Sequence, residues 1–324
     1  MPGAPVLVAP DDFKGTLSAP EVAEALAHGL RAAGAEAVEL PVADGGDGTL
    51  DVLLSVLGGV RRTEAVSDPL GRLVEAEWGL LPGGRTAVVE MARASGLRHV
   101  SEGERDAWTA STRGTGELIA AAAQAGAAEV LVAVGGSATT DGGAGAVEAL
   151  DAAGASPRLT VICDVQTAWE DAPALFGPQK GADPETVGRL ERRLEEMARR
   201  APRDPRGVVM TGCAGGLSGG LWAFRDARLV AGAAYVLDAL DFDRNMRASR
   251  FVVTGEGKLD AQTMSGKAVA EVATRCRQGG VVCHAVAGRS ELDLFRVRIL
   301  DLASVREAGT LEELEAAGRA LALP

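Results

Sequence analysis

The stretch of sequence that decides the fold reads VLVAVGGSATTDGGAG and covers residues 130–145. Its first five residues are apolar, as in a buried strand, and glycines, hydroxyl side chains and Asp141 follow directly. Glycines let backbone N–H groups come close to an anion, hydroxyls add hydrogen-bond donors, and a following helix contributes the positive end of its dipole. The stretch therefore predicts a strand, an anion-holding loop and a helix, although a tight strand-to-helix turn explains a single glycine-rich loop equally well.

Apolar runs alternate with helical patterns along most of the chain. Ser18 and Glu21 form a capping box ahead of a segment in which apolar residues recur every four positions, and Gly34 ends that segment. Such alternation predicts a parallel sheet with crossover helices, whose ligands gather at the carboxyl ends of the strands. The expected strands are Val6–Ala9, Ala37–Val42, Val130–Val134, Leu159–Cys163, Phe251–Thr254 and Val281–Ala287.

One segment breaks this alternation. Two apolar runs, Val74–Leu81 and Thr86–Met91, are joined by a Pro-Gly-Gly-Arg turn at residues 82–85. The pattern predicts an antiparallel hairpin, and we place a second domain there. The chain has 324 residues, which is long enough for two domains of ordinary size.

Composition limits the classes of partner. The chain is 47% hydrophobic and 24% charged, as in a globular protein, and its net charge is −12. That charge argues against nucleic acid or an anionic membrane as a partner, so a phosphorylated ligand has to meet local cations. The four cysteines form no C-x-x-C pair and predict neither a zinc site nor a disulfide framework. With no export signal or membrane span in the pattern, we expect a cytoplasmic location.

Carboxylates stand where predicted strands end. Asp44 and Asp47 lie among glycines after the second strand, Asp141 lies in the 130–145 stretch, and Asp164 follows Cys163. Carboxylate oxygens at such positions can bind Mg²⁺ or accept a proton from a substrate hydroxyl. The same positions are typical of helix N-caps and turns, and the residues alone leave the choice open.

A second candidate site lies between Thr254 and Lys267. This run combines two acids, two lysines, a glutamine and three glycines. It lacks the spacing of a P-loop, and no G-x-G-x-x-G follows the first strand, which argues against P-loop and dinucleotide-binding folds. Lys14, Lys180 and Arg113 lie near strand or helix ends, where they could neutralise phosphate or carboxylate oxygens.

Taken together, these motifs resemble the bacterial glycerate kinase family over nearly the full length of the chain. The family usually has serine, glutamate and asparagine where this chain has Asp12, Asp47 and Thr140. These differences concern the detail of substrate binding, while the acid and lysine positions match. The resemblance rests on residues 9–19, 43–49, 68–71, 90–97, 114–118, 135–145, 163–165, 176–182 and 254–267.

The resemblance implies an α/β fold of two domains. One is a Rossmann-like or flavodoxin-like domain with a parallel sheet, expected at residues 1–62 and 268–324. The other is a discontinuous α/β domain with a mixed sheet, expected at residues 63–267, with the active site in the cleft between the two. The implied reaction is direct in-line transfer of a phosphoryl group from ATP, with Mg²⁺, to D-glycerate, giving 2-phosphoglycerate. A homodimer is compatible with the resemblance.

Individual roles follow from the resemblance and from the loop positions. The expected catalytic residues are Asp44, Asp47, Asp141, Asp164 and Lys14, of which Asp44 and Asp164 are the expected Mg²⁺ ligands. The expected substrate-binding residues are Arg93, Ser95, Lys258, Asp260 and Gln262. The expected cofactor-binding residues are Gly135, Gly136, Ser137, Thr139, Gly142, Gly143, Gly255, Glu256, Lys267 and Lys180.

Alternative functions stay open on the residues alone. One is a kinase for another small hydroxy acid or a polyol. Another is a non-catalytic regulator that binds a nucleotide or a sugar phosphate. The lysines and acids in every glycine-rich loop argue against that alternative. A hydride-transfer enzyme is the weakest alternative, because the dinucleotide fingerprint is missing.

Overall fold

The computed structural model describes residues 3–265 and 267–322 and divides the chain into two compact units. Gly266, in the run from Thr254 to Lys267, lies outside the described residues. The first unit comprises the residues up to Asp44, Asp51–Val56 and the residues from Ala233 onward. The second comprises Gly45–Leu50 and Leu57–Gly232, so the chain changes unit within α2 (Thr49–Leu57).

The first unit is built on a five-stranded sheet in the order β11-β10-β9-β1-β2, in which all neighbours are parallel. Val8 and Val253 join α1 and α13 in one core, while Leu7 and Val252, which alternate with them, are equally buried. The predicted parallel sheet is therefore present, and both of its faces are covered. The strands are β1 (Val6–Pro10), β2 (Ala37–Glu39), β9 (Val252–Leu259), β10 (Cys283–Ser290) and β11 (Leu302–Glu307), and the helices are α1 (Ala19–Ala32), α9 (Gly232–Ala239), α10 (Phe242–Arg247), α11 (Ala268–Gly279), α12 (Leu294–Ile299) and α13 (Leu311–Ala322), with a 3-10 turn at Thr263–Ser265.

The capping box predicted for α1 is confirmed. The Glu21 amide donates to Ser18 Oγ over 3.5 Å, and the Glu21 carboxylate accepts from the Ser18 amide over 2.8 Å. The helix ends at Ala32, and Gly34 follows with a φ of 85°, a conformation that favours glycine.

The second unit is built on a six-stranded mixed sheet in the order β3-β4-β5-β6-β7-β8. The predicted hairpin is confirmed, because β4 and β5 pair antiparallel, and β5 to β8 are parallel. The strands are β3 (Val60–Ser67), β4 (Leu73–Leu80), β5 (Thr86–Glu90), β6 (Glu129–Ala133), β7 (Arg158–Cys163) and β8 (Arg228–Ala231). The α-helices are α3 (Ala92–Ser95), α4 (Arg113–Gln124), α5 (Ala144–Ala152), α6 (Ala172–Phe176), α7 (Pro184–Arg200) and α8 (Leu217–Arg225). Short 3-10 turns lie at Leu97–His99, Glu102–Glu104, Trp169–Asp171, Pro178–Lys180 and Cys213–Gly216.

The predicted α/β class with one parallel and one mixed sheet is confirmed, but the unit boundaries differ from those predicted. Strand β9 pairs with β1 and β10, so it belongs to the first unit, whereas the prediction placed residues 63–267 together. Strand β3 likewise carries residues 60–62 into the second unit. An apolar strand pattern does not encode which sheet the strand joins, because long-range pairing decides it.

Two further expectations concern the whole chain. All four cysteines are free thiols, and all are buried. In the part of the chain that the structure describes, no helix has the length and apolar character needed to cross a membrane.

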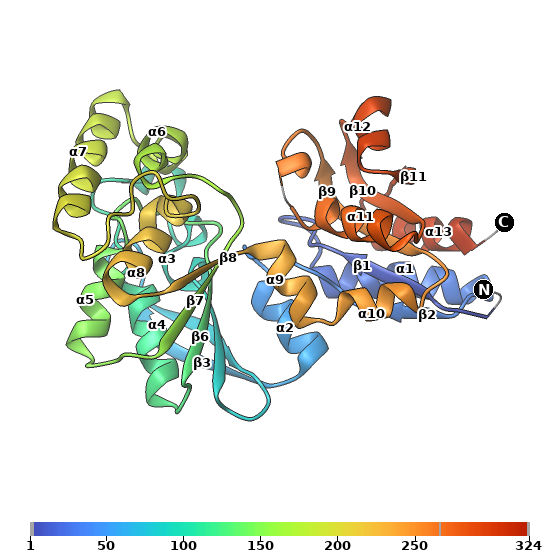
Figure 1. Ribbon diagram of the computed structural model, residues 1–324, viewed down its shortest axis with the longest axis horizontal. Coiled ribbons are helices and arrows are strands. Elements are labelled where there is room, and N and C mark those ends of the chain that lie inside the picture. Colours follow the sequence, from blue (N-terminus) through green and yellow to red (C-terminus); the bar gives the residue numbers. More distant parts are fainter. Residues whose placement is uncertain (1–2, 266, 323–324) are drawn as a thin grey trace. The chain divides into compact units, whose positions relative to one another are not determined.

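Helices α1 and α13 pack at backbone contact. A Cβ at Gly29 would lie 2.0 Å from the carbonyl oxygen of Glu315, and one at Gly318 would lie 2.3 Å from that of Leu26. Figure 1 shows the two helices side by side. Because these obstacles are backbone atoms, a larger residue can be accommodated only if a helix moves.

We therefore expect Gly29→Ala to lower the free energy of unfolding by about 1–3 kcal/mol, the usual cost of overpacking, even though alanine is the better helix former by about 1 kcal/mol. Gly188→Ala in α7 is the matched control, since the nearest atom to its Cβ would be Arg192 Nη1 at 3.7 Å. In Gly188→Ala the higher helix propensity of alanine should raise the free energy of unfolding. Urea unfolding of both variants measures the two signs, and a stabilised Gly29→Ala protein would contradict the close packing.

Candidate active site

The glycine-rich loop after β6 is clamped on two sides. A Cβ at Gly135 would lie 2.6 Å from Gly46 Cα, and one at Gly136 would lie 2.9 Å from Asp47 Oδ2. The Gly136 carbonyl accepts a hydrogen bond from the Leu97 amide over 3.0 Å. In the described chain the amide nitrogens of Gly135, Gly136 and Ser137 donate to no acceptor. The fixed loop thus presents donors of the kind that bind an anion.

Asp141 fixes the far end of this loop. Its carboxylate is 3% exposed and accepts from the amide and hydroxyl of Thr112, each over 2.8 Å. It also accepts from the amides of Gly143 and Gly145 in the first turn of α5, over 3.1 and 3.2 Å. A carboxylate that accepts from these four donors ties the loop to the N-terminal end of a helix. These contacts favour a structural role over the predicted catalytic one.

Lys180 contacts the loop from the protein interior rather than from the solvent side. Its side chain is buried, and Nζ donates to Ser137 Oγ over 2.8 Å and to the Thr139 carbonyl over 2.6 Å. Burial lowers the pKa of Lys180 to about 7, against the opposing effect of the Asp141 and Asp164 charges. The predicted contact of Lys180 with a cofactor would therefore have to pass through Ser137.

A pocket of about 250 Å³ opens beside the loop in the second unit. Of the predicted site residues, it brings together Gly135, Gly136, Ser137 and Asp164. Asp164 directly follows β7, so a carboxylate stands at the carboxyl end of a strand, where α/β sheets place their ligands. The remaining lining residues are Leu97, Val134, Val165, Phe176, Gln179 and Ala214.

Three predicted cofactor-binding residues of the loop do not line this pocket. Cβ atoms at Gly142 and Gly143 would meet Trp169 at 2.8 Å and Leu217 at 3.1 Å, so these glycines allow close packing. The Thr139 side chain is fully buried, and its hydroxyl has no hydrogen-bond partner among the described residues. Their part in the site is to shape the loop from within.

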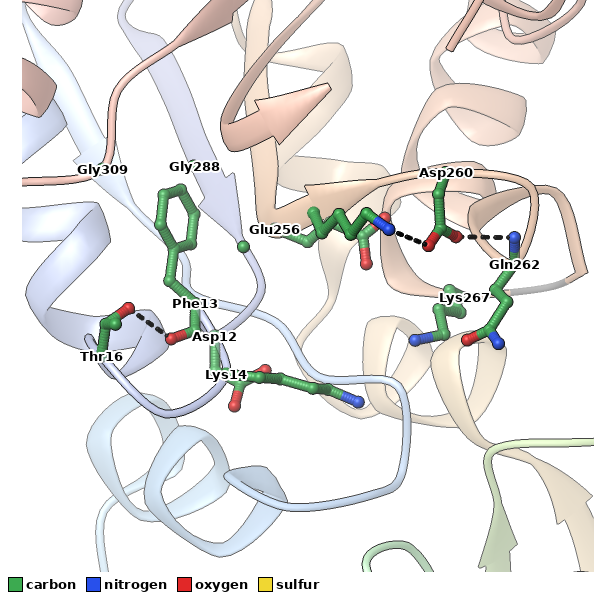
Figure 2. Close-up of a pocket in the computed structure, with 12 residues that line it drawn as sticks. Asp12, Phe13, Lys14, Thr16, Glu256, Asp260, Gln262, Lys267, Gly288 and Gly309 are labelled. Carbon is green, nitrogen blue, oxygen red and sulfur yellow. Dashed lines mark hydrogen bonds and ion pairs between the residues drawn. The ribbon is translucent and has the colours of Figure 1, made fainter. Parts of the chain in front are cut away.

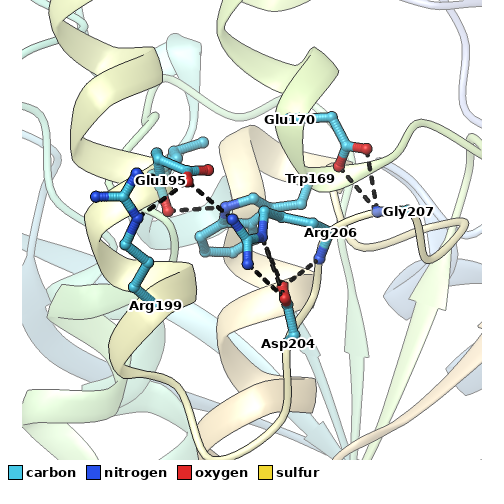
Figure 3. A network of polar contacts seen from close by, with 8 residues as sticks. Trp169, Glu170, Glu195, Arg199, Asp204, Arg206 and Gly207 are labelled. Atoms are coloured by element: carbon cyan, nitrogen blue, oxygen red, sulfur yellow. Dashed lines mark hydrogen bonds and ion pairs between the residues drawn. The ribbon is translucent and has the colours of Figure 1, made fainter.

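The packing around Gly142 is itself held by a polar network, shown in Figure 3. Trp169 Nε1 donates to the Leu194 carbonyl of α7 over 3.0 Å. Arg206 binds Asp204 over 2.6 Å and Glu195 of α7 over 2.8 Å, which ties the segment after α7 back to that helix. The hydrogen bond to Leu194 anchors the Trp169 ring, which packs against Gly142.

A second pocket, of about 390 Å³, lies in the first unit (Figure 2). It brings together six predicted site residues, namely Lys14, Glu256, Lys258, Asp260, Gln262 and Lys267. Gly255 is not among its lining residues. It packs against the neighbouring strand, where a Cβ would lie 2.0 Å from the Val286 carbonyl oxygen. Burial raises the pKa of Glu256, whose carboxylate accepts from the Thr263 hydroxyl over 2.6 Å.

Carboxylates crowd the carboxyl end of β1. Asp44 is buried, and its Oδ2 lies 4.0 Å from Lys14 Nζ. Burial raises the pKa of Asp11 well above its usual value, and the charges of Asp44 and Asp12 raise it further. A cation bound here would relieve this repulsion, so the donor set fits Mg²⁺. No three His, Cys, Asp or Glu side chains of residues 3–265 and 267–322 are grouped to hold a metal. Mg²⁺ would then need phosphate oxygens and water as further ligands, which is its usual preference.

Arg93 and Ser95 line neither pocket. The Arg93 guanidinium binds Glu90 over 2.8 Å and Glu77 over 2.5 Å. The Ser95 hydroxyl is fully buried and accepts from the Thr115 hydroxyl over 2.8 Å. Neighbouring residues engage both side chains, and their contact with substrate stays a prediction.

Sequence reasoning missed two charged partners of the site residues. Arg98 binds Asp47 over 2.9 Å, and Glu291 binds Lys258 over 2.9 Å and raises the pKa of that lysine. Neither residue lies in a glycine-rich motif. Each residue is a charged side chain a short distance after a candidate site motif. Charged residues at such positions are too common to identify a site.

A family model and several known proteins match this chain over most of its length. The family model described as "Glycerate kinase family" matches residues 6–156 and 150–316. A glycerate kinase of Bacillus subtilis (strain 168) is 38% identical over 89% of this chain and 86% of its own length. A glycerate 2-kinase of Escherichia coli (strain K12) is 38% identical over 81% of this chain and 79% of its own.

A solved structure agrees with the fold. It was assigned to glycerate kinase 2 of Salmonella typhimurium LT2, and it matches with a TM-score of 0.85 and 33% identity over 99% of this chain and 97% of that one. The family model covers both units, and the relatives match along most of both chains. The chain therefore belongs to the glycerate kinase family and is an enzyme of that family.

Proposed function

We propose that this enzyme transfers the γ-phosphoryl group of ATP to the 2-hydroxyl of D-glycerate, giving 2-phosphoglycerate and ADP. The observation that carries the proposal is the second-unit pocket, where Asp164 and the Ser137 hydroxyl border a loop with three available amide donors. Its volume of about 250 Å³ suits a three-carbon acid and is small for a nucleotide. The names of the relatives support the same substrate.

The first-unit pocket is the proposed nucleotide site. Lys14, Lys258 and Lys267 line it together with Asp12, Glu256 and Asp260, so the pocket offers three cations in a protein whose net charge is −12. A triphosphate needs such local cations, because the field of the whole protein repels it. This assignment gives Lys258, Asp260 and Gln262 to the nucleotide rather than to glycerate.

Asp164 is the proposed proton acceptor. In the reaction a bond forms between the glycerate hydroxyl oxygen and the γ-phosphorus, and the bond from that phosphorus to the bridging oxygen breaks. The electron pair leaves with ADP, and the hydroxyl proton passes to the Asp164 carboxylate. Positioning and charge neutralisation supply most of the acceleration in such transfers.

Asp44 is the proposed Mg²⁺ ligand, since it lies in the acidic cluster with Asp11 and next to Lys14. Mg²⁺ would neutralise charge on the phosphate oxygens. Lys14 then contributes a further positive charge at the same end of β1. Asp47 is held by Arg98 against Gly136, where it orients the loop.

Incubation with ATP, Mg²⁺ and D-glycerate should yield 2-phosphoglycerate, identified by phosphorus NMR. Chelation of Mg²⁺ with EDTA should abolish the product, and added Mg²⁺ should restore it. Formation of 3-phosphoglycerate would refute the regiochemistry, and turnover in EDTA would refute the metal requirement. A panel of other hydroxy acids and polyols separates this substrate from the alternatives.

Asp164→Asn and Asp141→Asn should fail in different ways. Loss of the proton acceptor in Asp164→Asn should lower kcat by about 10²- to 10⁴-fold while the protein stays folded. Asp141→Asn should lower the free energy of unfolding by about 1–3 kcal/mol, because the amide cannot accept from all four donors. Urea unfolding and steady-state kinetics of both proteins test the assignment, and the reverse pattern would exchange the two roles.

A further inference from the structure

The contact between Lys180 and Ser137 fixes the direction of a hydroxyl hydrogen. In its charged form Lys180 has three donors and no acceptor, so in that form Ser137 Oγ is the acceptor at the 2.8 Å contact. The hydroxyl hydrogen of Ser137 has to point elsewhere. No other described residue accepts it, and Ser137 lines the second-unit pocket.

The lysine cannot reach the pocket directly. Its side chain is 2% exposed, and Lys180 is not among the pocket-lining residues, whereas Ser137 is 7% exposed and is one of them. A second hydrogen bond of Lys180, to the Thr139 carbonyl over 2.6 Å, holds Nζ in place. The serine therefore stands between a buried positive charge and the space beside Asp164.

We propose that the Ser137 hydroxyl donates a hydrogen bond to an anionic oxygen of a bound substrate, and that Lys180 is the positioning residue that keeps this hydroxyl in the donor orientation. The inference rests on the proposed function and deepens it, since the oxygen belongs either to the carboxylate of the hydroxy acid or to the transferred phosphoryl group. Both oxygens carry the same negative charge, so the chemistry of recognition is shared.

Two physical effects support this arrangement. A hydroxyl that accepts a hydrogen bond from a cation becomes a stronger donor, because hydrogen bonds in a chain polarise one another. The lysine charge also lies in a poorly solvated region, where it acts on a nearby anion with little screening. Burial lowers the pKa of Lys180 to about 7, which shows how poorly water solvates its charge without a ligand.

The test is a double-mutant cycle with Ser137→Ala and Lys180→Met, read as dissociation constants for D-glycerate and, separately, for the non-hydrolysable ATP analogue AMP-PNP with Mg²⁺ by calorimetry. Each single variant should weaken one of these ligands by about 10- to 100-fold, the range for a hydrogen bond to a charged group. In the Ser137→Ala background, Lys180→Met should have a smaller effect than in the parent protein, because only the lysine charge is then lost. Ser137→Thr, which keeps the hydroxyl, should recover affinity, and Ser67→Ala, whose hydroxyl contacts Glu117 outside both pockets, is the matched control.

The outcomes separate the possibilities. Weakened binding of glycerate alone assigns the carboxylate, and weakened binding of AMP-PNP, with an increase in the KM for ATP, assigns the transferred phosphoryl group. Equal effects of Lys180→Met in both backgrounds, or unchanged affinity in Ser137→Ala, would overturn the proposal. Should Lys180→Met fail to fold, Ser137→Ala and Ser137→Thr still decide whether the hydroxyl binds the ligand. Absence of phosphoryl transfer by the parent protein would refute the proposed function instead.

Discussion

The close approach of two glycine-containing loops is the constraint on which the second-unit site depends. A Cβ at Gly135 would overlap Gly46, and a Cβ at Gly136 would press on the Asp47 carboxylate. Any side chain at these positions would push the loops apart by more than the packing of an interior tolerates. The available amides of residues 135–137 and the neighbouring pocket exist only while that contact holds.

Two buried groups of opposite charge maintain the loop from inside. Asp141 binds backbone and side-chain donors at the start of α5, and Lys180 binds Ser137 and the Thr139 carbonyl. Each charge is costly to bury, so it is tolerable only because hydrogen bonds engage it. The cost is visible in the lysine, since burial lowers its pKa to about 7. Such groups specify one loop conformation more than they add stability, because their desolvation offsets much of the attraction between them.

Structural features that depend on local sequence patterns were predicted correctly. The capping box of α1, the hairpin of β4 and β5, and the strand-loop-helix unit at residues 130–145 are all present, since each depends on residues close together in the chain. Segments far apart in sequence decide to which sheet β9 belongs, and they also supply Glu77 to Arg93 and Thr115 to Ser95. A motif shows that a residue stands in a constrained place, but not whether it faces a ligand or the interior, as Asp141 illustrates.

Uncharged hydrogen-bond donors let this acidic protein bind anions despite its negative net charge. A net charge of −12 opposes the approach of anionic substrates. An exposed lysine readily forms ion pairs with acids of the protein itself, as Lys258 does with Asp260 and Glu291. Backbone amides and a serine hydroxyl have no net charge, so they attract no carboxylate partner of their own and lose little when water is excluded. A lysine placed behind them adds positive potential without offering a surface cation to neighbouring acids. An acidic enzyme can in this way keep a site for anions that its own carboxylates do not fill.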